Sequence, residues 1–167
     1  MSTYRIRHLI LSLFMTLSVT GLANAAKLPM PLPETQFQEF TSKAQFNASD
    51  LQGKVIYLDF WASWCVPCRK SFPFMNELSK RYDSEKFQVI AVNMDEEQAD
   101  AEAFLAQYPA QFSIVTNPNN ALAKKLNIPG LPVAYIINAD GMILARHIGF
   151  NSSKKRKKLQ QLDSLLG

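Results

Sequence analysis

Two cysteines, Cys65 and Cys68, stand three positions apart in the segment WCVPC, and the chain contains no others. Such a pair could form a permanent disulfide, half of a metal site, or a disulfide that opens and closes. A bond closing so short a loop constrains little of the unfolded chain and adds little stability. Zinc takes about four ligands, yet His147 is the only histidine beyond the N-terminal region. The pattern therefore favours a redox-active pair and no metal.

The residues around the cysteines predict a strand followed by a helix. Residues 55–61 are apolar except for Asp59, which is typical of a strand buried on both faces. Helical spacing of apolar residues over 66–83 places Cys68 in the first turn of a helix, where free N–H groups and the helix dipole stabilise a thiolate. Pro67 suits that turn because its missing N–H has no partner there. The location therefore suits redox chemistry.

Beyond this helix the hydrophobic pattern predicts alternating strands and helices, followed by a hairpin and a last helix. Strands are expected at 87–94, 112–116, 132–138 and 142–150, and helices at 97–108, 119–128 and 152–167. The inward residues expected in the helix at 97–108 are Ala99, Ala103, Phe104 and Tyr108, and the expected caps of the last helix are Ser152 and Ser153. Asp140-Gly141 predicts the hairpin turn. This order implies an α/β fold, with a central mixed sheet flanked by helices on both faces.

The N-terminal residues have the three parts of a secretory signal. Arg5 and Arg7 precede an apolar core at 9–22, and Ala23-Asn24-Ala25 supplies small residues for cleavage. The apolar core is shorter than the roughly 20 residues that a membrane-spanning helix needs. We therefore expect a signal peptide over residues 1–25, cleaved after Ala25, and an exported, periplasmic protein. An uncleaved membrane anchor is the alternative.

The remaining chain is long enough for one domain. Residues 26–34 are proline-rich and predict an extended lead-in, and residues 35–167 the domain itself. Loss of the two N-terminal arginines lowers the formal net charge from +4 to about +2. So small a charge gives no support to a nucleic-acid partner.

The segments VIYLDFWASWCVPCRKSFPFM and GLPVAYIINADG resemble the exported TlpA/ResA branch of thioredoxin-like proteins. This resemblance covers residues 34–166 and implies a thioredoxin-like fold over the domain. It also implies a thiol–disulfide oxidoreductase whose only redox group is the Cys65–Cys68 disulfide. In this family the first cysteine attacks and the second resolves the mixed disulfide, so Cys65 and Cys68 take these roles.

The resemblance also implies a substrate-binding surface beside the cysteines. Pro132 matches the family's cis-proline, which turns the backbone of Leu131 toward the bound substrate strand. Trp64, Val66 and Pro67 are expected to contribute to the same substrate-binding surface, and Trp64 also to shape and shield the site. For Trp61 a functional role and a plain core role remain equally open.

Val66 and Pro67, between the cysteines, bear on the direction of electron flow. Strong oxidants of the superfamily stabilise the reduced thiolate, typically with a histidine between the cysteines, whereas this spacer adds no charge. We therefore expect a reductant of protein disulfides. Outside the cytoplasm such a protein needs electrons, and a membrane thiol carrier of the DsbD/CcdA type is the expected donor.

Asp59 interrupts an apolar strand six residues before Cys65. A buried, isolated carboxylate is costly, so we expect a raised pKa and a catalytic use. The position matches the buried acid of thioredoxin, while relatives in the TlpA/ResA branch carry a glutamate where this chain has Ser71. Proton transfer is therefore assigned to Asp59, with a purely structural acid as the alternative.

One dense run of positive charge occupies residues 154–158. It consists of Lys154, Lys155, Arg156, Lys157 and Lys158. In the first turns of a helix these charges oppose the dipole, so they do not serve helix stability. A solvated face is the simplest interpretation, and docking to anionic lipid or an acidic partner is the alternative.

Two classes of function compete. The first is an exported reductase, with cytochrome c biogenesis as one expected setting. The second is a thioredoxin-fold chaperone or assembly factor, and a disulfide donor is a further alternative. A thiol peroxidase is disfavoured because the threonine and arginine surroundings of a peroxidatic cysteine are not found.

Overall fold

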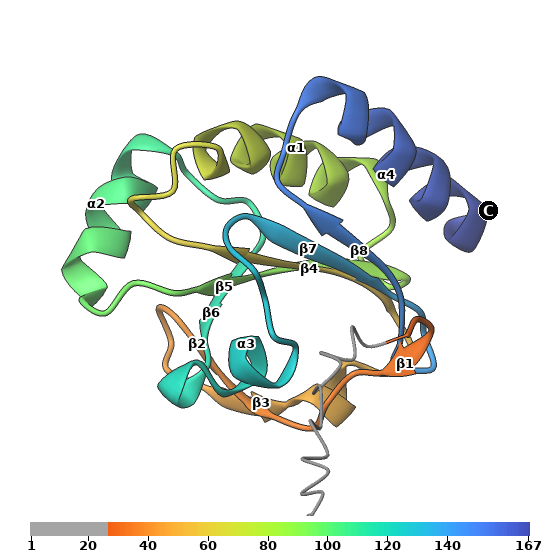
Figure 1. Ribbon diagram of the computed structural model, residues 1–167, viewed down its shortest axis with the longest axis horizontal. Helices are drawn as coiled ribbons and strands as arrows, with labels where there is room; N and C mark the ends of the chain where they lie inside the picture. Colours follow the sequence, from red (N-terminus) through yellow and green to blue (C-terminus); the bar gives the residue numbers. More distant parts are fainter. Residues whose placement is uncertain (1–26) are drawn as a thin grey trace, which may run out of the picture.

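The computed structural model describes residues 27–167, and an eight-stranded sheet forms its centre (Figure 1). The expected signal peptide over residues 1–25 and its cleavage site lie outside the described residues. Strands follow the order β1-β8-β7-β4-β5-β6-β2-β3 across the sheet. Among the described residues no helix is long and apolar enough to cross a membrane.

The strands are short, and the longest three have seven residues each. They are β1 (Met30–Pro31), β2 (Gln36–Glu39), β3 (Gln45–Asn47), β4 (Val55–Trp61), β5 (Phe87–Asn93), β6 (Ser113–Thr116), β7 (Val133–Ile137) and β8 (Met142–Ile148). The helices are α1 (Cys68–Arg81), α2 (Gln98–Gln107), α3 (Ala121–Lys125) and α4 (Ser152–Leu166), with 3-10 turns η1 (Ala48–Leu51) and η2 (Pro118–Asn120).

Strand β4 lies at the middle of the sheet and is buried along its whole length. It pairs in parallel with β5, which pairs in parallel with β6, and antiparallel with β7, which forms the hairpin with β8. The mixed sheet expected from the sequence is therefore confirmed. β4 leads directly into the cysteine motif, so the most enclosed strand positions the site.

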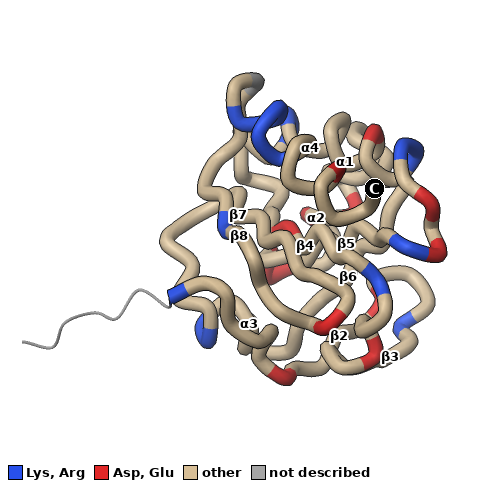
Figure 2. Tube along the Cα trace, turned by 90° about the vertical axis from the view of Figure 1, so that its right-hand side faces the viewer, with Lys and Arg blue, Asp and Glu red and all other residues tan. Residues whose placement is uncertain are grey.

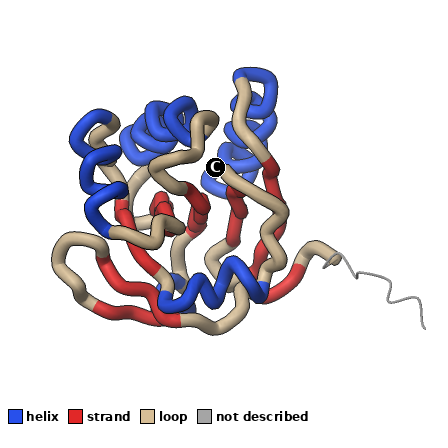
Figure 3. Tube along the Cα trace, turned by 60° about the vertical axis from the view of Figure 1, so that its left-hand side comes forward, coloured by secondary structure: helices blue, strands red, loops and turns tan. Residues whose placement is uncertain are grey.

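Helices cover both faces of the sheet, as Figures 1 and 3 show. Side chains of β4 alternate between these faces because successive residues of a strand point to opposite sides. Val55, Tyr57 and Trp61 join one buried cluster with residues of α1, α2 and α4. Ile56, Leu58 and Phe60 join the other cluster with residues of α3.

Several local predictions differ from the structure. The helix expected over 66–83 spans Cys68–Arg81, with Pro67 at its N-cap. In α2 the expected inward residues Ala99 and Ala103 are exposed, and Ala101 is buried with Phe104. The small alanines carry little information about which face is buried, which explains the error.

The two ends of the domain also differ in detail from expectation. The cap of α4 is Asn151 rather than a serine, and its side chain accepts a hydrogen bond from the backbone of Lys154. In the extended lead-in, Met30 and Pro31 form β1 and pair with β8. The basic residues of α4 gather near the start of this helix (Figure 2).

Candidate active site

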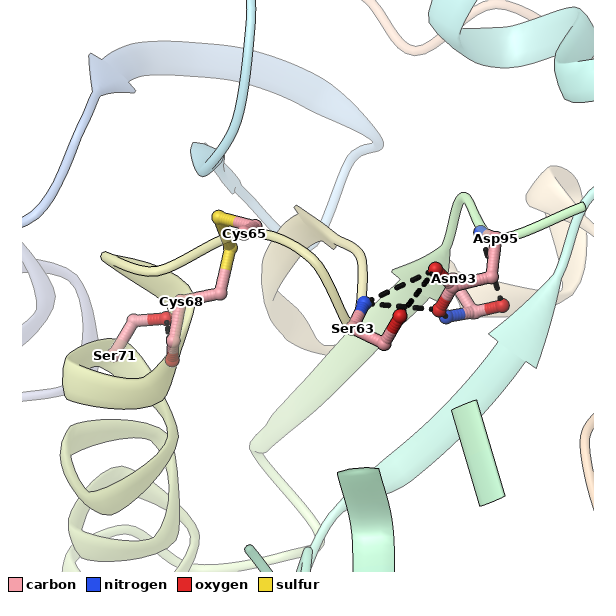
Figure 4. The surroundings of a disulfide bond; sticks show 6 residues. All are labelled: Ser63, Cys65, Cys68, Ser71, Asn93 and Asp95. Atoms are coloured by element: carbon pink, nitrogen blue, oxygen red, sulfur yellow. Dashed lines mark hydrogen bonds between the residues drawn. A yellow bond between two sulfur atoms is a disulfide. The ribbon is translucent and has the colours of Figure 1, made fainter. Parts of the chain in front are cut away.

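The cysteine motif lies in the loop between β4 and α1. Cys65 and Cys68 form a disulfide, with their Cα atoms 5.3 Å apart. The loop is a sequence of tight turns, in which Cys65 N–H donates to the carbonyl of Ala62 at 3.1 Å and Cys68 N–H to that of Cys65 at 3.0 Å. Figure 4 shows the disulfide at the first turn of α1. Cys68 is thus the first residue of the helix, at the positive end of its dipole.

Exposure differs between the two cysteines and their neighbours. Cys65 retains 3% of its surface and Cys68 none, whereas Trp64 and Val66 are 67% and 62% exposed. Large exposed apolar residues on both sides of Cys65 form a rim suited to a peptide. Access to the disulfide is therefore from the side of Cys65.

Leu131 and Pro132 precede β7. The Leu131–Pro132 peptide bond has the cis geometry that the sequence predicted. The carbonyl of the buried Pro132 accepts a hydrogen bond from Gly149 N–H at 2.8 Å. Leu131 is half-buried and packs against the cluster that includes Cys65 and Cys68. The structure thus brings this segment and the cysteine motif to one buried cluster.

A hydrogen-bonded carboxylate anchors the loop before Cys65. Asp95 accepts hydrogen bonds from Ser63 N–H at 3.0 and 3.1 Å, Ser63 Oγ at 2.8 Å and Asn93 Nδ2 at 2.7 Å (Figure 4). The sequence reasoning missed this network. A signal for it exists in the sequence. Asn93 ends β5 and Asp95 follows it, and the carboxyl ends of the parallel strands β4 and β5 meet at one edge of the sheet.

The carboxylate of Asp59 lies in the interior. Its residue is 1% exposed, and neither oxygen has a hydrogen-bond partner among the described residues. Tyr57 and Trp61, which point to the same face, belong to the cluster that contains both cysteines. Burial raises the pKa of Asp59 to about 7, against the opposing effect of Lys158. The direction of this pKa shift is the one expected from the sequence.

Lys158 of α4 faces the same interior and is 1% exposed. Its ammonium lies 4.8 Å from the ring centroid of Phe150, 5.6 Å from that of Tyr57 and 5.8 Å from that of Phe74. Burial lowers the pKa of Lys158 to about 8, while the negative charge of Asp59 acts in the opposite direction. A buried lysine therefore accompanies the buried acid.

The expectation of a single solvated basic face is wrong. Of the five, Arg156 and Lys157 are exposed and have no hydrogen-bond or ion-pair partner among residues 27–167, whereas Lys154 donates to the carbonyl of Ile148 and Lys155 pairs with Glu77. Five consecutive residues of a helix point in all directions, at 3.6 residues per turn. Because α4 packs against the sheet, at least one of these five side chains has to face the sheet, and that residue is Lys158.

The view of Asp59 as an isolated charge is also corrected. For an isolated buried carboxylate, Asp59→Asn would raise stability by removing an uncompensated charge. With Lys158 facing it, that substitution leaves a buried cation without its anion, which is itself destabilising. A simple gain in stability no longer follows.

Trp61 and Ser71 are both buried. Trp61 contacts Phe72 and Phe104 with ring centroids 4.9 Å apart in each case, which is a core environment. The hydroxyl of Ser71 donates to the carbonyl of Cys68 at 3.0 Å. Ser71 thus supports the first turn of α1 instead of supplying an acid.

No group of three or more potential metal ligands occurs within residues 27–167. His147 Nε2 lies 2.7 Å from Gln161 Oε1. Burial, followed by the charge of Lys158, lowers the pKa of His147 to about 4. The imidazole is therefore neutral at physiological pH.

The fold and the cysteine motif define a thioredoxin-like protein. The chain belongs to the Redoxin family, which matches residues 27–166. It is 33% identical over 105 residues to the thiol-disulfide oxidoreductase ResA of Bacillus cereus, covering 63% of this chain and 61% of the relative. ResA of Bacillus subtilis is 31% identical over 106 residues, or 64% and 59% of the two chains. The matched segment thus spans about three fifths of these relatives.

A solved structure extends the likeness over more of the fold. The crystal structure of a candidate thiol:disulfide interchange protein DsbE from Chlorobium tepidum is 38% identical, with a TM-score of 0.78. The match covers 83% of this chain and 97% of that one. The thioredoxin-like fold predicted from the sequence is therefore confirmed.

Proposed function

We propose that this protein is a thiol–disulfide oxidoreductase that reduces disulfides of proteins outside the cytoplasm. The observation that carries the proposal is the Cys65–Cys68 disulfide at the start of α1, with exposed Trp64 and Val66 on either side of Cys65. A purely structural bond would have no use for an apolar rim. The names of the ResA relatives and of the DsbE neighbour support the same chemistry.

The reaction transfers two electrons from the dithiol form. The Cys65 thiolate attacks one sulfur of a substrate disulfide, forming a mixed disulfide and releasing the other substrate sulfur as a thiolate. Cys68 then loses its proton and attacks Cys65 Sγ, which releases the second substrate thiolate. The protein is left oxidised as Cys65–Cys68, and both substrate thiolates take up protons.

Asp59 receives the proton from Cys68, directly or through water. Cys68 has no exposed surface, so its thiol needs a base to form the attacking thiolate. With a pKa of about 7, the Asp59 carboxyl can accept that proton at neutral pH. A base with the ordinary aspartate pKa would accept it far less readily.

The uncharged Val66-Pro67 spacer supports the reducing direction, with a potential below about −200 mV. Electrons then come from a membrane thiol carrier of the DsbD/CcdA type, and no cofactor beyond the disulfide is required. Equilibration with glutathione buffers measures the potential. A value near about −120 mV, that of a strong oxidant, would make the protein a disulfide donor instead.

Reduction of insulin by dithiothreitol tests the activity. The wild type should accelerate it, Cys65→Ser should abolish the acceleration, and Cys68→Ser should accumulate mixed disulfides because resolution is lost. In the reduced protein Cys65 should alkylate before Cys68. A chaperone or assembly factor would show no acceleration at all.

Cys68→Ser also captures the client in the periplasm, where cytochrome c biogenesis is the first setting to examine. Export rests on the signal pattern of residues 1–25 and predicts a mature chain that begins at Ala26. N-terminal sequencing checks this, and a membrane fraction that retains residues 1–25 would contradict it.

A further inference from the structure

We propose that Lys158 is a positioning residue of the redox site, which holds Asp59 in the ionised, proton-accepting form from the C-terminal helix. The proposal deepens the function given above and rests on the role of Asp59 in the resolving step. With Lys158, α4 contributes a residue to an active site whose other residues come from β4, the loop after it, α1 and the segment before β7.

Contacts on both sides of Lys158 dock α4 onto α1. Near the start of α4, Lys155 pairs with Glu77. Toward its end, Asp163 pairs with Arg81 at 3.1 Å and accepts a hydrogen bond from Tyr82 at 2.7 Å. These contacts hold the intervening turn against the sheet. Lys158 is thereby directed inward, one turn before the buried Leu162.

The surroundings of Lys158 suit a cation but do not neutralise it. Three aromatic rings enclose the ammonium, from Tyr57 of β4, Phe74 of α1 and Phe150 before α4. Ring faces attract a cation and replace part of the lost hydration. An apolar side chain would fill this space at lower cost, since a buried charge is expensive. A lysine here therefore indicates a use for its charge.

That use lies in the opposing charge of Asp59. The described residues leave both Asp59 oxygens without hydrogen bonds, so no donor contact holds the carboxylate in its ionised form. Lys158 acts on Asp59 through space, because the direct ion pairs of the described chain are those of Arg81 and Lys155. Burial favours the neutral acid and Lys158 favours the carboxylate, and the balance places the pKa near neutrality.

Other titratable groups around the pair do not provide this charge. From β4, the hydroxyl of Tyr57 has its pKa raised well above its ordinary value by burial and by Asp59, so it stays neutral. From β8, His147 is neutral because burial lowers its pKa. Lys154 and Lys157 of α4 are exposed, and on α1 Glu77 pairs with Lys155. Lys158 is thus the buried cation that acts on Asp59.

Lys155 offers a matched control. It lies one turn earlier on the same helix, and its ammonium is 5.7 Å from the centroid of the same Phe74 ring. Its side chain is 39% exposed and pairs with Glu77 instead of facing Asp59. A lysine-to-methionine change at either position removes one charge from α4 and keeps a similar volume.

The test compares Lys158→Met with Lys155→Met in the full mature chain. Carboxyl NMR of protein with 13C-labelled aspartate measures the titration of Asp59, and single-turnover kinetics measures mixed-disulfide resolution against pH. Lys158→Met should raise the midpoint of the Asp59 titration by about one pH unit or more. The midpoint of the pH profile for mixed-disulfide resolution should rise by the same amount. Resolution at pH 7 should slow about fivefold for a shift of one unit, because the ionised fraction of Asp59 falls from about one half to about one tenth. Lys155→Met should leave both midpoints in place.

An unchanged Asp59 midpoint in folded Lys158→Met would overturn the proposal, and so would an equal shift in Lys155→Met. If Lys158→Met does not fold, Asp59→Asn supplies the reciprocal measurement, because coupling between two sites is mutual. NMR of 13C-labelled lysine should then show a fall in the Lys158 midpoint, and no change would again overturn the pairing.

The same variant separates this proposal from the one on which it rests. A normal resolving rate in Asp59→Asn, with its Lys158 midpoint shifted, would support the pairing. That result would overturn only the role of Asp59 as proton acceptor.

Discussion

Two aspartates lie near the segment that leads from β4 into the cysteine motif. One is hydrogen-bonded and the other is buried without a hydrogen-bond partner among the described residues. Asp95 lies at the surface edge and accepts hydrogen bonds from Ser63 and Asn93. Asp59 lies in the interior, where neither of its oxygens has a partner within residues 27–167. The nearest compensation is the charge of Lys158, which acts through space.

The difference predicts two tasks for the same kind of side chain. The hydrogen bonds that Asp95 accepts tie its carboxylate to Ser63, so Asp95 is suited to holding the loop before Cys65 in place. Burial raises the pKa of Asp59 to about 7, which suits the proton exchange proposed for it. The contrast therefore predicts a positioning role for Asp95 and a proton-accepting role for Asp59.

Replacement of Asp59 should give the largest effect on catalysis. Asp59→Asn should slow mixed-disulfide resolution at pH 7 by about 10²-fold or more, because Cys68 loses its base. The initial attack by Cys65 should change much less. Rapid-quench measurement of both steps checks this, with Asp95→Asn as the matched control. If Asp95→Asn slows resolution as strongly as Asp59→Asn, the contrast between the two acids fails.

The second largest effect of Asp59 should be on the pH dependence of the free energy of unfolding. The folded-state pKa of Asp59, about 7, is above its ordinary value of 3.8, so the folded protein binds the proton more tightly than the unfolded chain. The stabilising contribution is therefore complete below about pH 4 and is lost as pH rises to about 7. The loss due to Asp59 should approach about 1 kcal/mol per pH unit, and it opposes the gain with rising pH that comes from His147, whose pKa is lowered from 6.5 to about 4.

Urea denaturation of the oxidised protein between pH 4 and pH 7 measures this slope. Asp59→Asn lacks the Asp59 contribution, so its stability should rise with pH more steeply than that of the wild type, by about 1 kcal/mol per pH unit. Equal slopes in the two proteins would show that Asp59 does not have the raised pKa described here.

Asp95 should matter for folding more than for proton transfer. Asp95→Ala leaves the donors of Ser63 and Asn93 without their acceptor, which should cost about 2 kcal/mol in the free energy of unfolding. The pH midpoint of resolution should stay where it is in the wild type. Denaturation and the kinetic pH profile measure the two quantities, and a moved midpoint would assign Asp95 a share of the proton chemistry.

The smallest effect is expected at Ser71. Ser71→Ala removes the hydrogen bond from its hydroxyl to the carbonyl of Cys68, at a cost of about 1 kcal/mol in stability. Resolution should proceed near the wild-type rate, because the hydroxyl is no base. If Ser71→Ala slows resolution while Asp59→Asn does not, the proton-accepting role has been assigned to the wrong residue.

Much of this fold could be predicted because its central strands have strong local patterns. The residues predicted for β4 match the observed strand, and the hairpin of β7 and β8 follows its Asp140-Gly141 turn signal. The short edge strands were not assigned. Met30 and Pro31 become a strand only because β8 provides a partner, and a two-residue strand has no periodicity of its own.

Within the site the sequence alone was enough to predict the cysteine pair and the buried acid. The spacing of Cys65 and Cys68 allows a disulfide within one turn of chain, and a carboxylate inside an apolar strand is conspicuous without any structure. Only the tertiary structure decided what faces that carboxylate. Lys158 stands 99 positions further along the chain, within a charge run that looks uniform as a sequence. The docking of α4 turns one of those five charges into the interior, because the orientation of a helix about its axis depends on the surface against which it packs.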